Sequence, residues 1–371
     1  MDASKGQVLF LGNGRCYHTM DWFRSAQTLR PELPPVLATE LIDGESFQKL
    51  VAPGDRVERL LVIDRILFNK QSRAGDVWRN LVKLFLLPVQ VVMFRRILRR
   101  YPAAVVHAHS MYYIALARFS GCRYVATPQG SEVLARPQRS LAYRFFARTA
   151  LEGAARITVD SVAMQGVLQN LFGISSALVQ NGIDISAIRD LQRRPVVRDR
   201  IVSIRGLVSN YHIDRILDSR NASAPGTPVD FCYPFSDANY RAGLQSKMIG
   251  GDRDLHRLAR RDLYQLLLSA YLVISIPSSD SSPRSVYEAI FCGCIVATTG
   301  GSWISQLPLC MRERIIVVNP DSDTWLPEAL RYARTQCLKP FMPSAEALDQ
   351  FDQQRSMRRF YDEVYPVALA V

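Results

Sequence analysis

Asp280 and Glu288 are two carboxylates that bracket a polar turn and the start of a predicted helix in SIPSSDSSPRSVYEAIFCGCIVATTGG, residues 275–301. An apolar run ends just before the turn, and a second one, 295–297, stops at two glycines. A helix that begins where a buried strand ends presents unpaired N–H groups and the positive end of its dipole, which attract phosphate. Both carboxylates could accept hydrogen bonds from hydroxyl groups of the same ligand. Phosphate together with several hydroxyls describes a sugar nucleotide.

The turn between the two carboxylates carries side chains suited to such a ligand. We predict that Ser282 caps the helix and that Pro283 occupies its first position, where a missing N–H costs nothing. Ser281, Arg284 and Ser285 flank this helix start, so we assign them to the same ligand site together with Ser282.

A site of this kind needs a parallel sheet to position it, and the chain shows the corresponding pattern nearly throughout. Short, continuous apolar runs alternate with helical stretches, first over 7–178 and again from 201 onward. Continuous apolar strands are typical of parallel sheets covered on both faces, so we predict the α/β class. Ligands bind beyond the carboxyl ends of such strands. The corresponding segments are 12–18, 107–110, 127–132, 205–211 and 278–288.

A polar, basic break at 183–200, IDISAIRDLQRRPVVRDR, separates the two α/β series. At ~150 residues per domain, a chain of 371 residues corresponds to two domains. We predict a Rossmann-like domain at 1–185, a second one at 198–350, and an amphipathic helix at 351–371 that packs on the first domain.

The composition is that of an ordinary globular chain, with 48% apolar and 22% charged residues. A formal charge of +12 indicates an anionic partner: a phosphorylated small molecule, an acidic membrane surface or nucleic acid. Seven scattered cysteines without a CxxC pair predict reduced thiols in a cytosolic protein. No apolar run reaches the ~20 residues that span a bilayer, and the N-terminus lacks the pattern of a signal peptide. We therefore expect a cytoplasmic protein.

Residues 81–100 combine an apolar stretch, LFLLPVQVVMF, with a basic end at 95–100. A buried helix with a solvated end accounts for this composition. The alternative is a surface helix that contacts anionic lipid on the inner face of the cytoplasmic membrane. In either case Pro88 is expected to kink or break the helix.

Several motifs resemble those of retaining glycosyltransferases of the GT-B fold, in particular the family 4 group that builds bacterial polysaccharides. The family motif is acid-G-F-G-x-x-x-L-E-A followed by a C-G strand. It resembles Asp280-Ser-Ser-Pro-Arg-Ser-Val-Tyr-Glu288-Ala289 and Cys292-Gly293-Cys294. Weaker similarities lie in GNGRCYHTMDW, HAHSMYYIALA, ATPQGSEVL, QNGIDISAI and SIRGLVSNYHIDRIL.

The resemblance implies two Rossmann-like domains that face a central cleft, with the C-terminal helix crossing back to the first domain. It implies transfer of a sugar from a nucleotide-diphosphate sugar to an acceptor hydroxyl with retention, in cell-surface polysaccharide or glycolipid assembly. No metal or other cofactor is expected. The acceptor would be a saccharide or a lipid-linked saccharide, an anionic membrane surface would be a further partner, and nucleic acid would not be one.

The matching positions carry the roles that the family suggests. Asp280 would contact the donor sugar, Glu288 the ribose, and Arg205 the diphosphate. Gly14 and His18 would lie on the acceptor side, in the first domain. The catalytic candidates are Asp280, Arg205, His109 and Gln129.

Two basic residues could replace a charge that the family usually has. Asn210 and Tyr211 stand where a Lys is common, which leaves Arg205 alone in the usual Arg and Lys pair. We predict that Arg284 or Lys247 supplies the missing positive charge for the donor diphosphate.

Two further departures concern the reacting groups. Gln129 stands where the family often has His, so an inactive transferase remains an alternative. Pro283 removes one N–H from the loop that would bind the donor. Of the two histidines in HAH, we assign His107 to the interior, hydrogen-bonded, and His109, nearer the strand end, to the site. We expect their side chains on opposite faces of the strand.

Other functions remain alternatives at this stage. A sugar-nucleotide epimerase or hydrolase could use the same fold, and a non-catalytic polyanion- or membrane-binding protein would explain the basic charge. Gly12-x-Gly14 resembles part of a dinucleotide fingerprint, but Tyr17 stands where the third glycine would fall. Asp252-Arg-Asp254 resembles a metal-binding DxD, but it lies far from the predicted strand ends, so we predict a loop.

Overall fold

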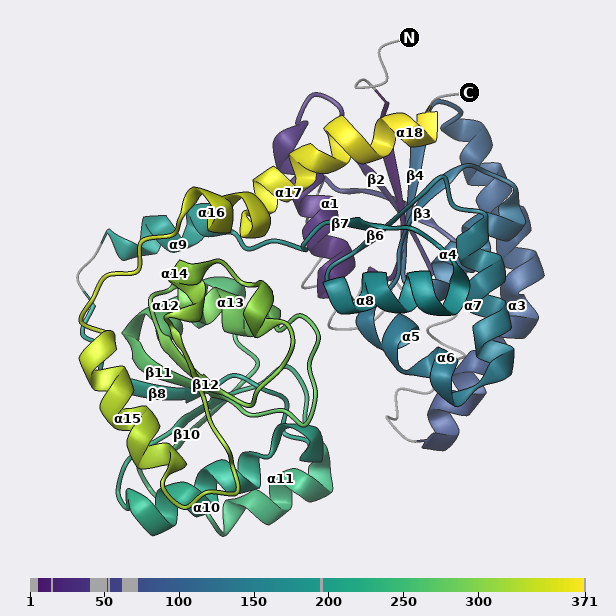
Figure 1. The fold of residues 1–371 in the computed structure, drawn as a ribbon. Coiled ribbons are helices and arrows are strands. Elements are labelled where there is room, and N and C mark those ends of the chain that lie inside the picture. The colour runs from purple at the N-terminus through teal and green to yellow at the C-terminus, as the bar shows by residue number, and fades with distance from the viewer. Residues whose placement is uncertain are drawn as a thin grey trace. The chain divides into compact units, whose positions relative to one another are not determined.

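The computed structural model describes residues 6–14, 16–40, 52, 54–61, 73–193 and 196–369. The chain forms two compact units (Figure 1): unit 1 contains Met1–Asn181 and Gln353–Val371, and unit 2 contains Gly182–Asp352. The sequence pattern placed the corresponding boundaries between 185 and 198 and at 350. Each unit holds one parallel sheet with helices, which confirms the α/β class and its two Rossmann-like domains.

Unit 1 is built on a parallel sheet with the strand order β3-β2-β1-β4-β5-β6-β7. The strands are β1 (Val8–Leu11), β2 (Val36–Thr39), β3 (Arg56–Arg59), β4 (Val105–His109), β5 (Tyr124–Thr127), β6 (Arg156–Val159) and β7 (Ala177–Leu178). Every residue of the four central strands β2, β1, β4 and β5 is buried, whereas the edge strand β3 is polar and partly exposed. This pattern is the one expected of a parallel sheet covered on both faces.

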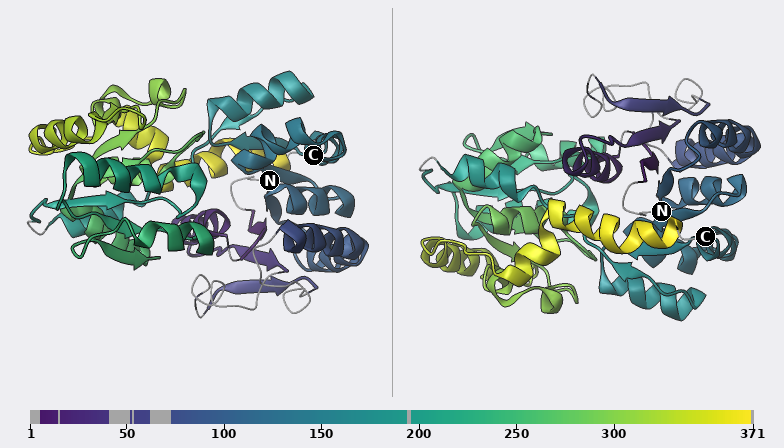
Figure 2. Two further views of the ribbon diagram at one scale, coloured as in Figure 1. Left: turned by 90° about the horizontal axis from the view of Figure 1, so that it is seen from below. Right: turned by 90° about the horizontal axis from the view of Figure 1, so that it is seen from above.

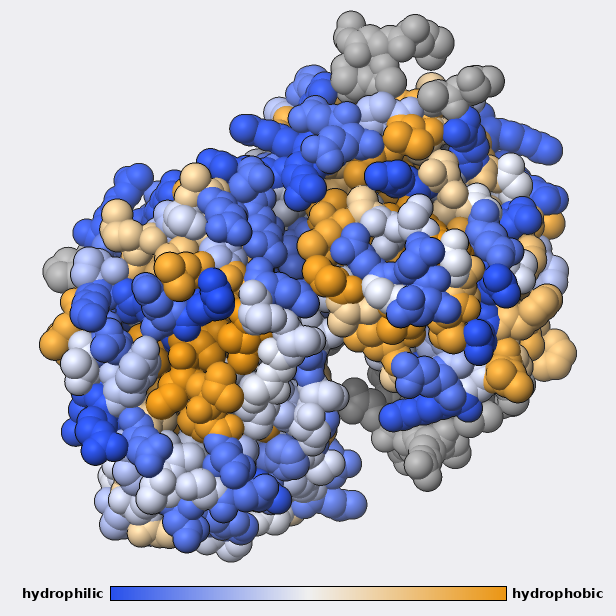
Figure 3. All heavy atoms as spheres, in the orientation of Figure 1, coloured by the Kyte–Doolittle hydropathy of each residue, from blue (hydrophilic) through white to orange (hydrophobic). Residues whose placement is uncertain are grey.

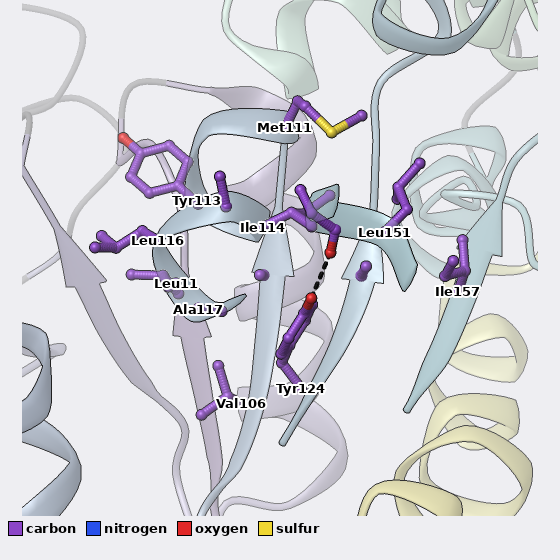
Figure 4. Close-up of a cluster of buried hydrophobic side chains, with 14 of the residues drawn as sticks. Leu11, Val106, Met111, Tyr113, Ile114, Leu116, Ala117, Tyr124, Leu151 and Ile157 are labelled. Atoms are coloured by element: carbon purple, nitrogen blue, oxygen red, sulfur yellow. Dashed lines mark hydrogen bonds between the residues drawn. The ribbon is translucent and has the colours of Figure 1, made fainter. Parts of the chain in front are cut away.

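Three helices cover one face of this sheet, with α4 (Met111–Ser120) between α3 (Arg73–Arg100) and α7 (Leu141–Glu152) (Figure 2). Their shared core contains Leu11, Val106 and Ile114 (Figure 4). The Tyr124 hydroxyl at the start of β5 donates a hydrogen bond to the carbonyl of Ala150 near the end of α7. The shorter helices of the unit are α5 (Gly130–Leu134), α6 (Arg136–Arg139) and α8 (Val162–Val167).

The other face of the sheet is covered by α1 (Tyr17–Leu29) and by the last helices of the chain, α17 (Gln353–Arg359) and α18 (Tyr365–Leu369). Val8 and Phe10 belong to this second core and Leu9 and Leu11 to the first, because successive side chains of a strand point to opposite faces. The C-terminal helices are thus part of the core of unit 1.

Unit 2 repeats the plan with the strand order β10-β9-β8-β11-β12-β13, again all parallel. The strands are β8 (Arg200–Ser203), β9 (Asp230–Cys232), β10 (Arg253–His256), β11 (Ala270–Ser275), β12 (Ile295–Thr298) and β13 (Ile315–Val317). The helices are α9 (Ile185–Gln192), α10 (Ile213–Ser223), α11 (Ala238–Gln245), α12 (Arg260–Ser269), α13 (Arg284–Phe291), α14 (Leu309–Arg312), α15 (Trp325–Gln336) and α16 (Ala345–Phe351). One core lies beneath α12 and α13, the other beneath α10 and α15.

α3 continues through Pro88, so the break that the sequence predicted there does not occur. Pro88 and Leu84 both lie on the exposed side of the helix, where water can reach the Leu84 carbonyl that loses its N–H partner. Burial of Val91, Phe94 and Ile97 on the opposite side holds the helix on the sheet. Among the described residues, no helix is both long enough and apolar enough to cross a membrane.

Candidate functional site

The carboxyl edge of the sheet in unit 2 brings together Arg205 and Asp280, which the sequence assigned to one site. Arg205 follows β8 and Asp280 follows the neighbouring strand β11. Their side chains form an ion pair, with 12% of Arg205 and 19% of Asp280 exposed. Arg205 Nε also donates to Ser275 Oγ, the last residue of β11, over 2.7 Å. A fixed, largely buried guanidinium at this edge is a strong partner for a phosphate group.

Residues 210–212, which include the two positions 210 and 211 where the resemblance led us to expect a Lys, hold Arg205 and the loop that carries Asp280. The ring centre of Tyr211 lies 5.1 Å from the guanidinium carbon of Arg205, within range of a cation–π contact. The carbonyl of Asn210 accepts the N–H of Ser278 at 2.8 Å, and His212 Nε2 lies 2.8 Å from Ser278 Oγ. The segment therefore ties the arginine to the loop that carries Asp280.

α13 begins at Arg284, one residue later than predicted, with Pro283 and not Ser282 at the capping position. The ψ angle of Pro283 is 81°, outside the helical range, so this residue precedes the first helical one. Its carbonyl accepts the N–H groups of residues 286 and 287 at 2.9 and 3.2 Å. The side chain of Pro283 forms no cap hydrogen bond. The helix start therefore stays close to the loop that carries Asp280, as the prediction required, but without the serine cap.

Three serines surround this helix start. Ser281, Ser282 and Ser285 are all half-buried. Ser285 Oγ is shielded from solvent and has no hydrogen-bond partner among the described residues. Because a buried hydroxyl without a partner is costly, such a group is well suited to bind a ligand atom.

Glu288 lies one turn into α13 and is nearly buried, with 8% of its side chain exposed. Its Oε1 lies 3.4 Å from Nε of Arg284 and accepts a hydrogen bond of 3.2 Å from the Tyr264 hydroxyl on α12. Burial, and then the negative charge of Glu288, raise the pKa of Tyr264 well above its usual value, so the phenol remains a donor. Arg284 and Glu288 are thus brought together on the first turns of the helix.

Lys247 does not join these residues, so the structure does not support it as the second cation. It follows α11 and pairs with Asp218 on α10 at 2.6 Å. Its carbonyl accepts a hydrogen bond from Arg220, which is bound to Asp252 just before the start of β10. Lys247 therefore lies at the edge where the strands begin, opposite the edge of Arg205, because a helix of a parallel α/β unit returns the chain to that edge.

The DxD at 252–254 is not the loop that the sequence predicted, because Asp254 lies within β10. Asp252 and Arg220 form an ion pair in which both side chains are fully buried, and Asp252 also accepts the N–H of Val229 at 2.9 Å. Asp254 accepts from Arg241 at 2.7 Å. Asp252 thus binds an arginine just before β10, and Asp254 binds an arginine of α11 from within that strand.

Unit 1 contains a pocket of about 210 Å³ at the carboxyl edge of its own sheet. Its polar lining includes His18, His109, Gln129, Asp160 and Asn181. The first three were predicted from the strand-end motifs. Gly14 is not part of the lining, and its N–H donates to Thr39 Oγ1 at the end of β2 over 3.1 Å. Asp160 and Asn181 were not predicted as site residues, although each follows a strand of the sheet and the carboxyl-edge rule would have selected both.

The two histidines of the pocket are held by neighbouring side chains. His109 Nδ1 lies 2.7 Å from Thr19 Oγ1, and His18 Nδ1 lies 3.0 Å from Asn181 Nδ2. Burial, followed by electrostatic interaction with His18 and His107, lowers the pKa of His109 well below its usual value. His109 is therefore neutral at physiological pH and can accept or donate a hydrogen bond without carrying charge.

Gln129 is held in the pocket wall by its backbone. Its N–H donates to Glu132 Oε2 at 3.0 Å, and the N–H of Met111 donates to the same oxygen at 2.8 Å. Burial raises the pKa of Glu132, while these two N–H groups oppose that shift. Glu132, which the sequence did not single out, thereby joins the loop after β5 to the start of α4.

His107 is fully buried and hydrogen-bonded, as predicted. Its Nε2 lies 2.8 Å from Thr127 Oγ1 and its Nδ1 lies 3.0 Å from the Tyr365 hydroxyl of the C-terminal helix. The expectation that His107 and His109 face opposite sides is wrong: both approach side chains of the α1 face, because residues two apart in a strand share a face.

Burial of His107 predicts a pH dependence of stability. Burial lowers the pKa of His107 to about 3, whereas an unfolded histidine titrates near ~6.5. The unfolded state therefore binds more protons between these values, and stability that is present above pH ~6.5 is lost as the pH falls. The contribution is at most ~1.4 kcal/mol per pH unit.

Denaturant unfolding at a series of pH values measures this slope. Between pH ~6.5 and ~4, the free energy of unfolding of His107→Gln should change less steeply with pH than that of the wild type. The difference in slope should correspond to the uptake of about one proton on unfolding. Equal slopes in the wild type and His107→Gln would contradict the assignment.

Comparisons with known proteins agree with the fold. A family model described as glycosyltransferase family 4 matches residues 50–187. Anabaena HepE in complex with UDP and glucose is 15% identical, with 96% of this chain and 98% of that chain covered and a TM-score of 0.70. Sucrose-phosphate synthase from Thermosynechococcus elongatus is 14% identical, with 98% and 96% covered and a TM-score of 0.66.

A glycosyltransferase from Rickettsia africae is 12% identical, with 98% of this chain and 99% of that chain covered and a TM-score of 0.70. No curated protein matches the chain. At such identities the solved structures show the fold alone, while the family match adds the kind of protein. The family match over residues 50–187, together with this fold, supports a glycosyltransferase of the family 4 type with the GT-B fold.

Proposed function

We propose that this glycosyltransferase moves a sugar from a nucleotide-diphosphate sugar to an acceptor hydroxyl and retains the anomeric configuration. The observation that carries the proposal is the arrangement of Arg205 and Asp280 at the carboxyl edge of the second sheet. A cation and a carboxylate at this edge can bind different parts of the donor. The cation would bind the diphosphate, and the carboxylate would accept a hydrogen bond from a sugar hydroxyl.

Binding of the donor would rearrange the Arg205–Asp280 pair. The diphosphate competes with Asp280 for the guanidinium, and the carboxylate that it displaces becomes an acceptor for hydroxyls of the sugar. Ser281, Ser282 and Ser285 would bind phosphate oxygens at the start of α13, where helix N–H groups favour negative charge. Arg284 would add its charge from the first turn.

Glu288 would fix the nucleoside by accepting hydrogen bonds from the ribose. Tyr264 and Arg284 hold its Oε1, so the position of the carboxylate is set before the ligand arrives. The relatives support a nucleoside diphosphate as the ligand, since HepE is described in complex with UDP and with UDP and glucose.

The reaction would proceed by departure of the diphosphate, which Arg205 stabilises as charge develops on it. The leaving phosphate would take the proton of the acceptor hydroxyl on the same face of the sugar, which accounts for retention. Neither a metal ion nor another cofactor takes part in this scheme. His109 and Gln129 in the pocket of unit 1 would orient the reacting groups by hydrogen bonds.

The acceptor would bind in the pocket of unit 1. The uncharged His109 and Gln129 and the carboxylate of Asp160 suit a ligand rich in hydroxyl groups. We propose a saccharide or a lipid-linked saccharide as the acceptor, in the assembly of cell-surface polysaccharide or glycolipid. The reaction would take place in the cytoplasm or on the inner face of the membrane.

Titration calorimetry with UDP, GDP, ADP, CMP and dTDP tests the donor site. One nucleoside diphosphate should bind clearly more tightly than the others. Lys247→Ala is the matched control and should keep the wild-type affinity, because Lys247 lies at the opposite edge of the sheet. If none of the five nucleotides binds, the proposed function is contradicted.

A companion NMR experiment separates transfer from other reactions of the same donor. Rapid conversion or hydrolysis of the sugar nucleotide by the protein alone, without any acceptor, would favour an epimerase or hydrolase. The proposal predicts slow turnover of the donor alone and a product glycoside with the anomeric configuration of the donor.

A further inference from the structure

The outward face of the helical layer in unit 1 carries large apolar side chains. Leu84 and Phe85 on α3 are 61% and 79% exposed, and Leu141 and Phe145 on α7 are 80% and 74% exposed. Single exposed apolar residues are ordinary, but residues that gather on one face mark an interaction surface. Figure 3 shows apolar atoms at the right-hand edge of the molecule, over the region where Figure 1 draws α3 and α7.

On α3 the apolar side chains form a stripe that ends in arginines. Phe85, Val89, Val92, Arg96 and Arg99 are all exposed, and their spacing of three and four residues places them on one side of the helix. The opposite side of the same helix is buried in the core of unit 1. The exposed side is therefore apolar in its first half and basic in its second.

The two helices present their apolar halves at the same edge of the sheet. Lys83, next to Leu84, pairs with Glu40 directly after β2, so the first half of α3 lies at the carboxyl edge. The end of α7 lies at the opposite edge, where the carbonyl of Ala150 accepts from Tyr124 at the start of β5. Because the helices run antiparallel to the strands, the first half of α7 also lies at the carboxyl edge, which contains the acceptor pocket.

Basic side chains outnumber acidic ones behind and beside these apolar residues. Of the carboxylates there, Glu58 pairs with Arg100, Glu152 pairs with Arg148, and Glu40 pairs with Lys83. Among the residues whose exposure is described, the exposed arginines on α3, α4, α6 and α7 are Arg95, Arg96, Arg99, Arg100, Arg118, Arg136, Arg139 and Arg148.

We propose that this face, formed by Leu84, Phe85, Leu141 and Phe145 with the arginines behind them, binds the surface of an anionic lipid bilayer. The four apolar side chains would enter the boundary between headgroups and acyl chains, and the arginines would contact lipid phosphates. The apolar side chains are followed by arginines, and a bilayer likewise has phosphates next to its acyl chains all along its surface. This match favours a bilayer over a protein partner. The proposal goes beyond the composition of 81–100, since it adds α7 and fixes the orientation.

Insertion of the four apolar side chains would bring the carboxyl edge of the first sheet, where the proposed acceptor pocket lies, toward the bilayer. A lipid-linked acceptor could then reach the pocket while its lipid stays in the membrane. Only this consequence rests on the proposed function; binding of the face to lipid does not require that the protein transfers a sugar.

Sedimentation with vesicles tests the proposal. The wild type should bind vesicles that contain phosphatidylglycerol, and bind vesicles of pure phosphatidylcholine at least tenfold more weakly. Phe85→Ser/Phe145→Ser should lower the affinity for the anionic vesicles at least tenfold. Arg96→Glu/Arg99→Glu should do the same and should make the remaining binding less sensitive to salt.

Leu309→Ser/Leu338→Ser is the matched control, because both leucines are exposed apolar residues of unit 2, 62% and 82% exposed. It should bind vesicles like the wild type. Equal vesicle binding by the wild type and Phe85→Ser/Phe145→Ser would overturn the proposal. So would a dimer that forms without lipid, together with no vesicle binding, since the face would then bind a second copy of the chain. Calorimetry with the preferred nucleotide in both double variants keeps this result separate from any failure of the donor site.

Discussion

Arg205→Ala is expected to lower the rate of sugar transfer by at least ~10²-fold, because one preorganised charge donor at a leaving group contributes ~10²–10³-fold in comparable sites. Arg205 is held by Asp280, Ser275 and Tyr211, so its guanidinium needs little rearrangement to meet the diphosphate. Initial-rate assays with the nucleotide sugar identified by calorimetry measure the effect. A rate within threefold of the wild type would contradict the assigned role.

Asp280→Asn separates the two halves of the ion pair. The amide removes the negative charge that competes with the diphosphate for Arg205, so the affinity for the nucleoside diphosphate should rise or stay unchanged. The rate of transfer should fall, because the neutral amide is a weaker acceptor for the sugar hydroxyl. A similar loss of nucleotide affinity in Asp280→Asn and Arg205→Ala would indicate that both variants merely disturb the loop. The thermal midpoints of both variants, measured without nucleotide, provide the control for folding.

Glu288→Gln is expected to weaken the binding of the nucleoside diphosphate about 10-fold or more, because hydrogen bonds to a charged group contribute ~1.5–3 kcal/mol. The substitution keeps the shape of the side chain beside Tyr264 and Arg284, so a loss of affinity reports on the charge. Calorimetry measures it, with Glu328→Gln, at an exposed carboxylate on α15, as the matched control.

A double-mutant cycle shows whether Glu288 contacts the ribose. The nucleotide without ribose hydroxyls should bind the wild type more weakly than the normal nucleotide does, whereas Glu288→Gln should discriminate little between the two. Additive losses in the protein and the ligand would mean that Glu288 acts through the fold of α13 and not through the ribose.

The sequence predicted the sheets and several site residues because both follow from local patterns. The first five residues of β11 are apolar and all six are buried, as the parallel-sheet pattern requires. Arg205 and Asp280 were selected because each follows such a strand, and parallel neighbours bring their carboxyl ends to one edge. The same rule would have selected Asp160, but no family motif drew attention to it.

The failures concern pairings that depend on packing between distant segments. Lys247 is distant from Arg205 and Asp280 both in the sequence and in the fold, because α11 returns the chain to the amino edge before β10. Asp252 looked like a solvated loop residue, yet it is buried with Arg220, 32 positions away. Ser282 failed as a cap because the ψ angle of Pro283 starts the helix one residue later.

A crystal structure of the protein with its preferred nucleoside diphosphate tests the central claim most directly. We predict a terminal phosphate oxygen within hydrogen-bond distance of the Arg205 guanidinium, phosphate density at the start of α13, and a ribose oxygen within reach of Glu288. A nucleotide bound elsewhere, with the Arg205–Asp280 pair unchanged and no contact to α13, would contradict the account of the donor site.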